Sequence, residues 1–135
     1  MYLINACLSP TNSSMILKFT LKGKCSEILN SLNLSSPTAK MDLLGESVQC
    51  FPLYSILAAV EIYHVNLFSL DVDWPELDIL KTIPYDEIQF DIITAEKRVQ
   101  NDPEATLKNE KAMIKLLEPQ GYTKDINDGV DIIFL

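Results

Sequence analysis

One continuous stretch, residues 65–80, constrains the fold of this chain more than any other. Its first half, residues 65–72, is almost continuously apolar, which is typical of a strand buried on both faces of a parallel sheet. The acids Asp71 and Asp73 stand where the apolar run stops, and Pro75 suits the first turn of a helix, where no backbone N–H is needed. Open α/β sheets form ligand crevices at strand ends of this kind.

The rest of the chain predicts further elements of an α/β fold. Strands are expected at residues 2–8, 15–21, 48–51, 90–95, 122–126 and 130–135, and helices at 53–60, 76–80 and 103–119. Residues 25–47 are rich in Ser, Asn and Leu and predict a loop with at most one helical turn. The last two strands are joined by Asn127-Asp128-Gly129, a tight-hairpin signal. Alternating strands and helices before a closing antiparallel hairpin indicate an α/β fold.

Length and charge argue against several classes of function. Nineteen acids and eleven bases give a formal net charge of −8, which disfavours nucleic acid or an anionic membrane as a partner. No apolar run approaches the ~20 residues of a membrane span. A length of 135 residues favours one domain, residues 1–135, with a substantial core.

The cysteines and two short motifs leave the cellular compartment open. Cys7, Cys25 and Cys50 are widely spaced and have no histidine nearby, which argues against zinc and does not establish a disulfide. Their apolar surroundings favour structural thiols for Cys7 and Cys50. Asn12-Ser13-Ser14 and Asn33-Leu34-Ser35 match the N-glycosylation sequon, which matters only if the chain enters the secretory pathway.

Acids follow two of the predicted strands and are the candidate site residues. Asp71 and Asp73 follow the central strand, and Glu96 follows the next one. Because such strands normally lie side by side, these carboxylates are expected to converge on one crevice. The alternative is that the acids only cap and solvate the strand ends, and for Asp71 and Glu96 both interpretations stay open. For Glu76 and Asp78 we favour the second, since a negative charge in a helix's first turn is stabilised by ~0.3–1 kcal/mol.

Two other kinds of site lack their parts in this sequence. The single histidine, His64, precedes the central strand and is expected at the end away from the crevice, so no nucleophile pair or metal site is predicted around it. Nucleotide-type cofactors are held by a Gly-rich turn, and the four glycines, at 23, 45, 121 and 129, are too far apart to make one.

Three segments, in order along the chain, resemble FkbM-type methyltransferase domains, in particular their animal Star-like branch. Residues 4–11 read INACLSPT, like the branch's own segment. Residues 50–59 read CFPLYSILAA and resemble its CxPLYSILLA. Residues 69–84 read SLDVDWPELDILKTIP and resemble the family's SLDVEGxELxVLKTIP.

The resemblance implies a Rossmann-like class I methyltransferase fold that uses S-adenosylmethionine. Asp71 and Glu76 match acids that the family retains, Asp73 stands for its glutamate, and Glu96 matches the acid after the next strand. A carboxylate there would orient the methyl acceptor or take its proton. The chain departs from the family in two ways: Asp73-Trp74 replaces Glu-Gly, and the sequence begins at the family's third strand.

We therefore expect an incomplete methyltransferase-like domain that lacks the cofactor-binding strands and is inactive as this chain. The parent fold would methylate a hydroxyl or amine of a small or glycan-like acceptor. Strand 65–72 would become a sheet edge and a route to self-association. The alternative is a non-enzymatic, Star-like interaction module in secretory or endosomal protein trafficking. The parent protein would then belong to the secretory pathway or endosomal membrane, and otherwise to the cytoplasm.

Overall fold

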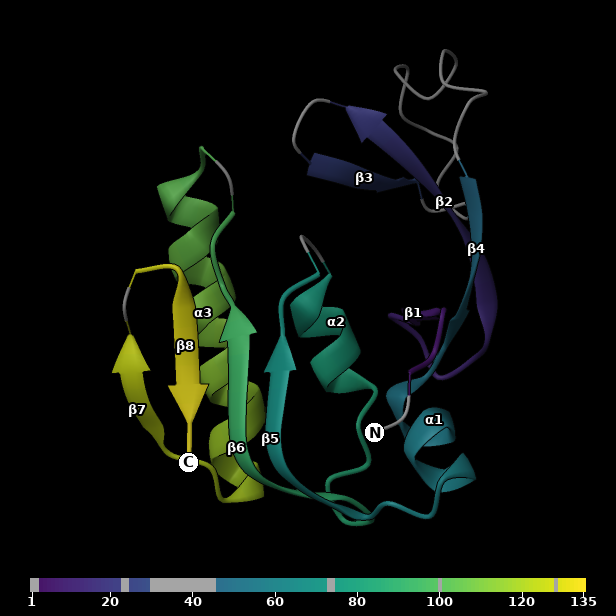
Figure 1. Cartoon of the computed structure of the whole chain (residues 1–135). Coiled ribbons are helices and arrows are strands. Elements are labelled where there is room, and N and C mark those ends of the chain that lie inside the picture. The colour runs from purple at the N-terminus through teal and green to yellow at the C-terminus, as the bar shows by residue number, and fades with distance from the viewer. Residues whose placement is uncertain (1–2, 23–24, 30–45, 73–74, 100, 128) are drawn as a thin grey trace.

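The computed structural model describes residues 3–22, 25–29, 46–72, 75–99, 101–127 and 129–135, which form a mixed α/β fold with two four-stranded sheets and three α-helices (Figure 1). In chain order the elements are β1 (Cys7–Leu8), β2 (Met15–Lys22), β3 (Cys25–Leu29), β4 (Glu46–Phe51), α1 (Leu53–Ala59), β5 (His64–Leu70), α2 (Glu76–Lys81), β6 (Gln89–Glu96), α3 (Pro103–Leu117), the 3-10 turn η2 (Glu118–Gln120), β7 (Lys124–Asn127) and β8 (Asp131–Phe134).

The sheet of the C-terminal half has the strand order β5-β6-β8-β7. Strands β5 and β6 are parallel, β8 is antiparallel to β6, and β7 pairs antiparallel with β8 as a hairpin. This arrangement confirms the predicted parallel pair and the predicted closing hairpin. It also places β5 at the edge of its sheet, as the resemblance implied.

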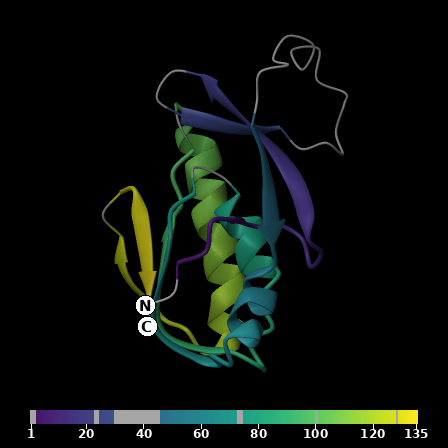
Figure 2. The ribbon, with the colours of Figure 1, turned by 45° about the vertical axis from the view of Figure 1, so that its right-hand side comes forward.

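Helices α2 and α3 pack on one face of this sheet, as the two views show (Figures 1 and 2). The core between them is apolar and consists of Leu70, Leu80, Ile93, Met113, Leu117, Ile132 and Phe134, together with their buried neighbours. The prediction that strand 65–72 is buried on both faces was wrong. Leu70 is its only fully buried position within β5, and Leu67 is 57% exposed. An edge strand with helices on one side keeps an exposed face whatever its composition.

Local signals at the helix ends explain where the helices begin and stop. The Asp102 side chain accepts a hydrogen bond from the Ala105 N–H at 2.8 Å, and Pro103 follows as the first helical residue of α3. Gly121 takes a φ of 97°, which ends the η2 turn in the left-handed conformation that glycine favours. Pro52 and Pro75 precede α1 and α2 as cap residues rather than lying in their first turns.

None of the helices in the described part of the chain is long and apolar enough for a bilayer span.

The N-terminal third forms a second sheet that the sequence did not predict, with the order β1-β4-β2-β3. In Figure 1, α2 is drawn between β5 of the first sheet and β1 of the second. Strand β2 pairs antiparallel with β3 on one side and with β4 on the other. Residues 25–29 are therefore a strand, because pairing with β2 overrides a loop-like local composition. Strand β1 covers Cys7–Leu8 alone. Of the rest of the predicted loop, residues 46–47 belong to β4 and residues 30–45 lie outside the described residues.

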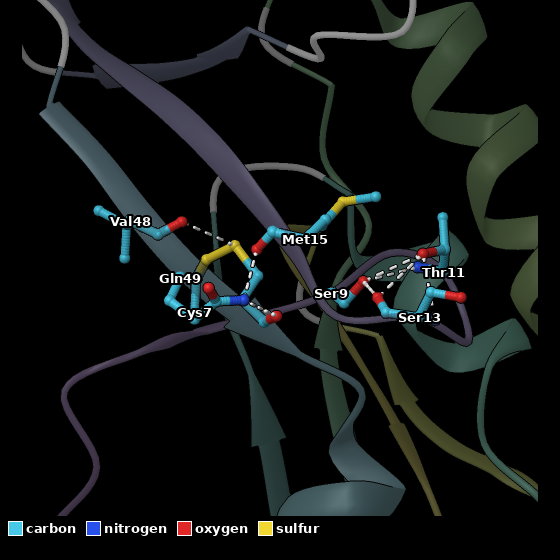
Figure 3. Close-up of a disulfide and its surroundings, with 8 residues drawn as sticks. Cys7, Ser9, Thr11, Ser13, Met15, Val48 and Gln49 are labelled. Atoms are coloured by element: carbon cyan, nitrogen blue, oxygen red, sulfur yellow. Dashed lines mark hydrogen bonds between the residues drawn. A yellow bond between two sulfur atoms is a disulfide. The ribbon is translucent and has the colours of Figure 1, made fainter.

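A disulfide joins Cys7 of β1 to Cys50 of β4 (Figure 3). The two cysteines are direct partners in the parallel β1–β4 pair, with Cα atoms 4.3 Å apart. The expectation of structural thiols at these positions was therefore wrong. A separation of 43 residues hides their contact from any local pattern. Closing a loop of this length stabilises the folded chain by about 4 kcal/mol in the chain-entropy account.

An ion triad of one buried and two partly buried side chains fixes α3 to the end of β6 and the start of β7. Lys97, only 4% exposed, donates to Glu110 at 2.8 Å, and Lys124 donates to the other carboxylate oxygen at 3.0 Å. The hydrogen bond from Lys97, followed by that from Lys124, lowers the pKa of Glu110 to about 2. The Asn109 amide also donates to the Lys97 carbonyl at 3.0 Å. Residue 97 is thus an anchor, although residues 97–102 look like a polar loop in the sequence.

Glu110→Ala should destabilise the protein by roughly 3 kcal/mol at neutral pH, because it leaves Lys97 buried beside a missing carboxylate. The folded-state pKa of Glu110 lies below the unfolded value, so its contribution is present above about pH 4.3 and is lost as pH falls toward 2. Urea unfolding at pH 7 and near pH 2.5 measures both effects. Glu104→Ala, at an exposed position of the same helix, is the control. An equal loss of stability in Glu110→Ala and Glu104→Ala would contradict the role of Glu110 as the anchor of the ion triad.

Candidate functional site

The register of β5 against β6 brings two candidate acids together. Leu70 is paired with Ala95, so Asp71 and Glu96 follow side by side at the carboxyl ends of the two strands. Carboxylate oxygens of Asp71, Glu76 and Glu96 all lie within 4.8 Å of one another. The predicted convergence of Asp71 and Glu96 is confirmed. We call this edge of the sheet, at the carboxyl ends of β5 and β6, the rim, and Asp71, Glu76 and Glu96 the rim acids. Asp73, the third candidate, lies outside the described residues.

Glu76, the first residue of α2, joins this cluster, although the sequence favoured only a stabilising charge in the first turn of a helix. Glu76 is only 5% exposed, and its Oε1 accepts a hydrogen bond from the Val72 N–H at 3.0 Å. The side chain thus fixes the turn that carries Asp71. The four-residue spacing between Val72 and Glu76 was the available signal. For Asp78 the surface interpretation fits, since its carboxylate pairs with Lys81 at 2.8 Å.

The environment of Glu96 disfavours its negative charge. Burial is the largest cause that raises its pKa, and the neighbouring negative charge of Asp71 is the next. Arg98 lies 3.3 Å from Glu96 and opposes the rise, but its side chain is 56% exposed, so water screens the pair. A carboxyl group with a raised pKa can exchange a proton with a ligand closer to neutral pH than an ordinary glutamate.

Three carboxylate oxygens at this spacing also offer the hard ligands that Mg²⁺ or Ca²⁺ prefers. The same group can therefore act in two ways, as a proton acceptor or as a cation ligand. No metal site was predicted from the sequence, because its histidine and cysteines lack the spacing of metal ligands and Glu76 was assigned to the first turn of a helix.

The other end of the sheet has a separate polar cluster. His64 contacts the Asp91 carboxylate at 2.7 Å, and the Asn66 amide donates to its second oxygen at 2.7 Å. The hydrogen bond with His64, then that from Asn66, lowers the pKa of Asp91. His64 is the first residue of β5, so it lies at the amino end of that strand, away from the rim acids, as the sequence predicted.

Comparisons with known proteins add no relative to this description. No known protein family, curated protein or solved structure matches the chain. The geometry of its own residues is what supports a function.

Glu96→Gln should make the protein more stable than the parent at neutral pH. The folded-state pKa of Glu96 is raised, so the ionised side chain destabilises the fold once pH exceeds its ordinary value of about 4.3. The amide removes that charge at nearly the same volume. The stability difference should shrink as pH falls from the raised folded-state pKa toward that ordinary value, and it should vanish below the ordinary value. Chemical denaturation across this pH range checks the expectation.

Glu104→Gln removes one charge from an exposed helical position and serves as the matched control. A Glu96→Gln protein that is less stable than the parent at pH 7, or whose difference does not depend on pH, would contradict the electrostatic description of the rim.

Proposed function

We propose that this chain is the C-terminal part of an FkbM-type, S-adenosylmethionine-dependent methyltransferase-like domain. The observation that carries the proposal is the juxtaposition of Asp71 and Glu96 at the carboxyl ends of parallel neighbouring strands, where open α/β sheets bind ligands. The strand order β5-β6-β8-β7 supports it as well, since a parallel sheet closed by an antiparallel hairpin is the ending of class I methyltransferases.

The three acids would act on the methyl acceptor. Glu96, whose pKa is raised, would take the proton from an acceptor hydroxyl or amine as the methyl group is transferred. Asp71 would orient that acceptor from the neighbouring strand, and buried Glu76 would hold the turn in place through its bond to the Val72 N–H. A small or glycan-like acceptor follows from the family resemblance.

The cofactor side of the site would be incomplete in this chain. S-adenosylmethionine needs the backbone N–H groups of a glycine turn and an acid for its ribose, and the sequence has no such turn. The free edge of β5 is where the family's first two strands would pair. Acceptor positioning without a bound methyl donor gives no transfer, so the isolated chain would be inactive.

The disulfide favours a second candidate function, a Star-like interaction module in secretory or endosomal protein trafficking. Disulfides persist in oxidising compartments and are rare in the cytosol, and Cys7–Cys50 links β1 to β4 in the N-terminal sheet of this chain. Such a module would retain the fold without catalysis. The exposed edge of β5, with Leu67 open to solvent, would then be a surface for self-association.

Calorimetric titration of the chain with S-adenosylmethionine should show no binding. Trp74→Gly restores the family's glycine and should remain equally inert, because one glycine does not supply the missing N–H groups. A complete class I methyltransferase in the same buffer is the positive control. A dissociation constant in the micromolar range, roughly −8 kcal/mol, would show that a complete cofactor site exists and would overturn the proposal.

The transcript upstream of Met1 separates the two candidate functions. A Gly-rich turn encoded there would favour the enzyme. A transmembrane segment without such a turn would favour the trafficking module.

A further inference from the structure

The loop between β1 and β2, residues 9–14, is closed by its own hydroxyl groups (Figure 3). Ser9 is fully buried at the base of the loop, and its backbone N–H donates to the Phe51 carbonyl at 2.8 Å. Its hydroxyl donates to the Ser13 carbonyl at 2.7 Å, and the Thr11 hydroxyl donates to the same carbonyl at 3.2 Å. The loop is therefore held from within, by Ser9 and Thr11.

This closure leaves the side chains of Asn12, Ser13 and Ser14 exposed. Neither the Asn12 amide nor the Ser14 hydroxyl has a hydrogen-bond partner among the described residues. A bulky group on Asn12 would thus break no hydrogen bond within the part of the chain that the structure describes. The three exposed residues are the sequon Asn12-Ser13-Ser14.

A sequon is glycosylated only in a chain that enters the secretory pathway. The segment before Asn12 provides evidence for such entry, because it contains a disulfide-bonded cysteine. Cys7, five positions before Asn12, is disulfide-bonded to Cys50. Disulfides form in the oxidising endoplasmic reticulum lumen, which is also where N-glycans are added. The disulfide therefore points to the compartment in which N-glycans are added, and the exposed sequon is accessible there.

We propose that Asn12 is an N-glycosylation site. The amide Nδ2 of Asn12 forms a bond to the anomeric carbon of a lipid-pyrophosphate-linked oligosaccharide. The bond from that carbon to the pyrophosphate oxygen breaks, the lipid pyrophosphate leaves with the electron pair, and the proton that Nδ2 loses passes to water. The hydroxyl of Ser14 is the part of the sequon that the transferring enzyme requires.

The proposal is independent of methyl transfer. It concerns the loop after β1, whereas the rim acids follow β5 and β6. It agrees with the compartment of the trafficking module. The second sequon, at Asn33, lies outside the described residues and is removed in the test by Asn33→Gln.

The test is expression of the full chain behind a cleavable secretion signal in cultured animal cells, with cells and medium analysed together. In the Asn33→Gln background, the chain should carry one glycan that peptide N-glycosidase removes. The enzyme converts the glycosylated asparagine to aspartate, and peptide mass spectrometry should locate that change at residue 12. Adding Asn12→Gln should abolish the glycan.

Two adjacent serines provide the matched control. Ser14→Ala should abolish the glycan, whereas Ser13→Ala, which leaves the sequon intact, should retain it. Recovery of unmodified Asn12 in chain that contains the Cys7–Cys50 disulfide would overturn the proposal. A glycan that survives Ser14→Ala would do the same. Neither result depends on the outcome of the cofactor titration.

Discussion

The parallel pairing of β5 with β6 is the constraint on which the candidate site depends. A constant register from His64 opposite Gln89 to Leu70 opposite Ala95 makes the two strands end together. The residues at their carboxyl ends then have no freedom to separate, because neighbouring strands lie only ≈ 4.8 Å apart. The rim is thus a consequence of backbone hydrogen bonding, and α2 adds Glu76 to it through the turn after β5.

Two clusters of charged side chains in this molecule shift the pKa of a glutamate in opposite directions. At Lys97, Glu110 and Lys124, two cations flank one carboxylate, the pKa of Glu110 falls, and the arrangement anchors α3. At Asp71, Glu76 and Glu96, carboxylates gather with each other and the pKa of Glu96 rises. The first group stabilises the fold. Perturbed carboxyls of the second kind, at a strand-end rim, are typical of functional sites.

The sequence predicted those features that local patterns encode. The strand before Asp71, the helix predicted at 103–119 and the closing hairpin each depend on patterns that span only nearby residues. The features that it missed depend on contacts between distant segments. The Cys7–Cys50 disulfide joins residues 43 positions apart, and strand β3 exists because β2 lies beside it. The burial of Glu76 and Lys97 likewise depends on packing that composition does not reveal.

The most direct test of the rim is the ionisation of Glu96, followed by carbon-detected NMR of its side-chain carboxyl as pH is varied. The account predicts a pKa above the ordinary glutamate value, lowered again in Asp71→Asn, since that substitution removes the neighbouring negative charge. Asp78→Asn, which removes an acid paired with Lys81, should leave Glu96 unchanged. A Glu96 carboxyl that titrates like an exposed glutamate and ignores Asp71→Asn would contradict the account.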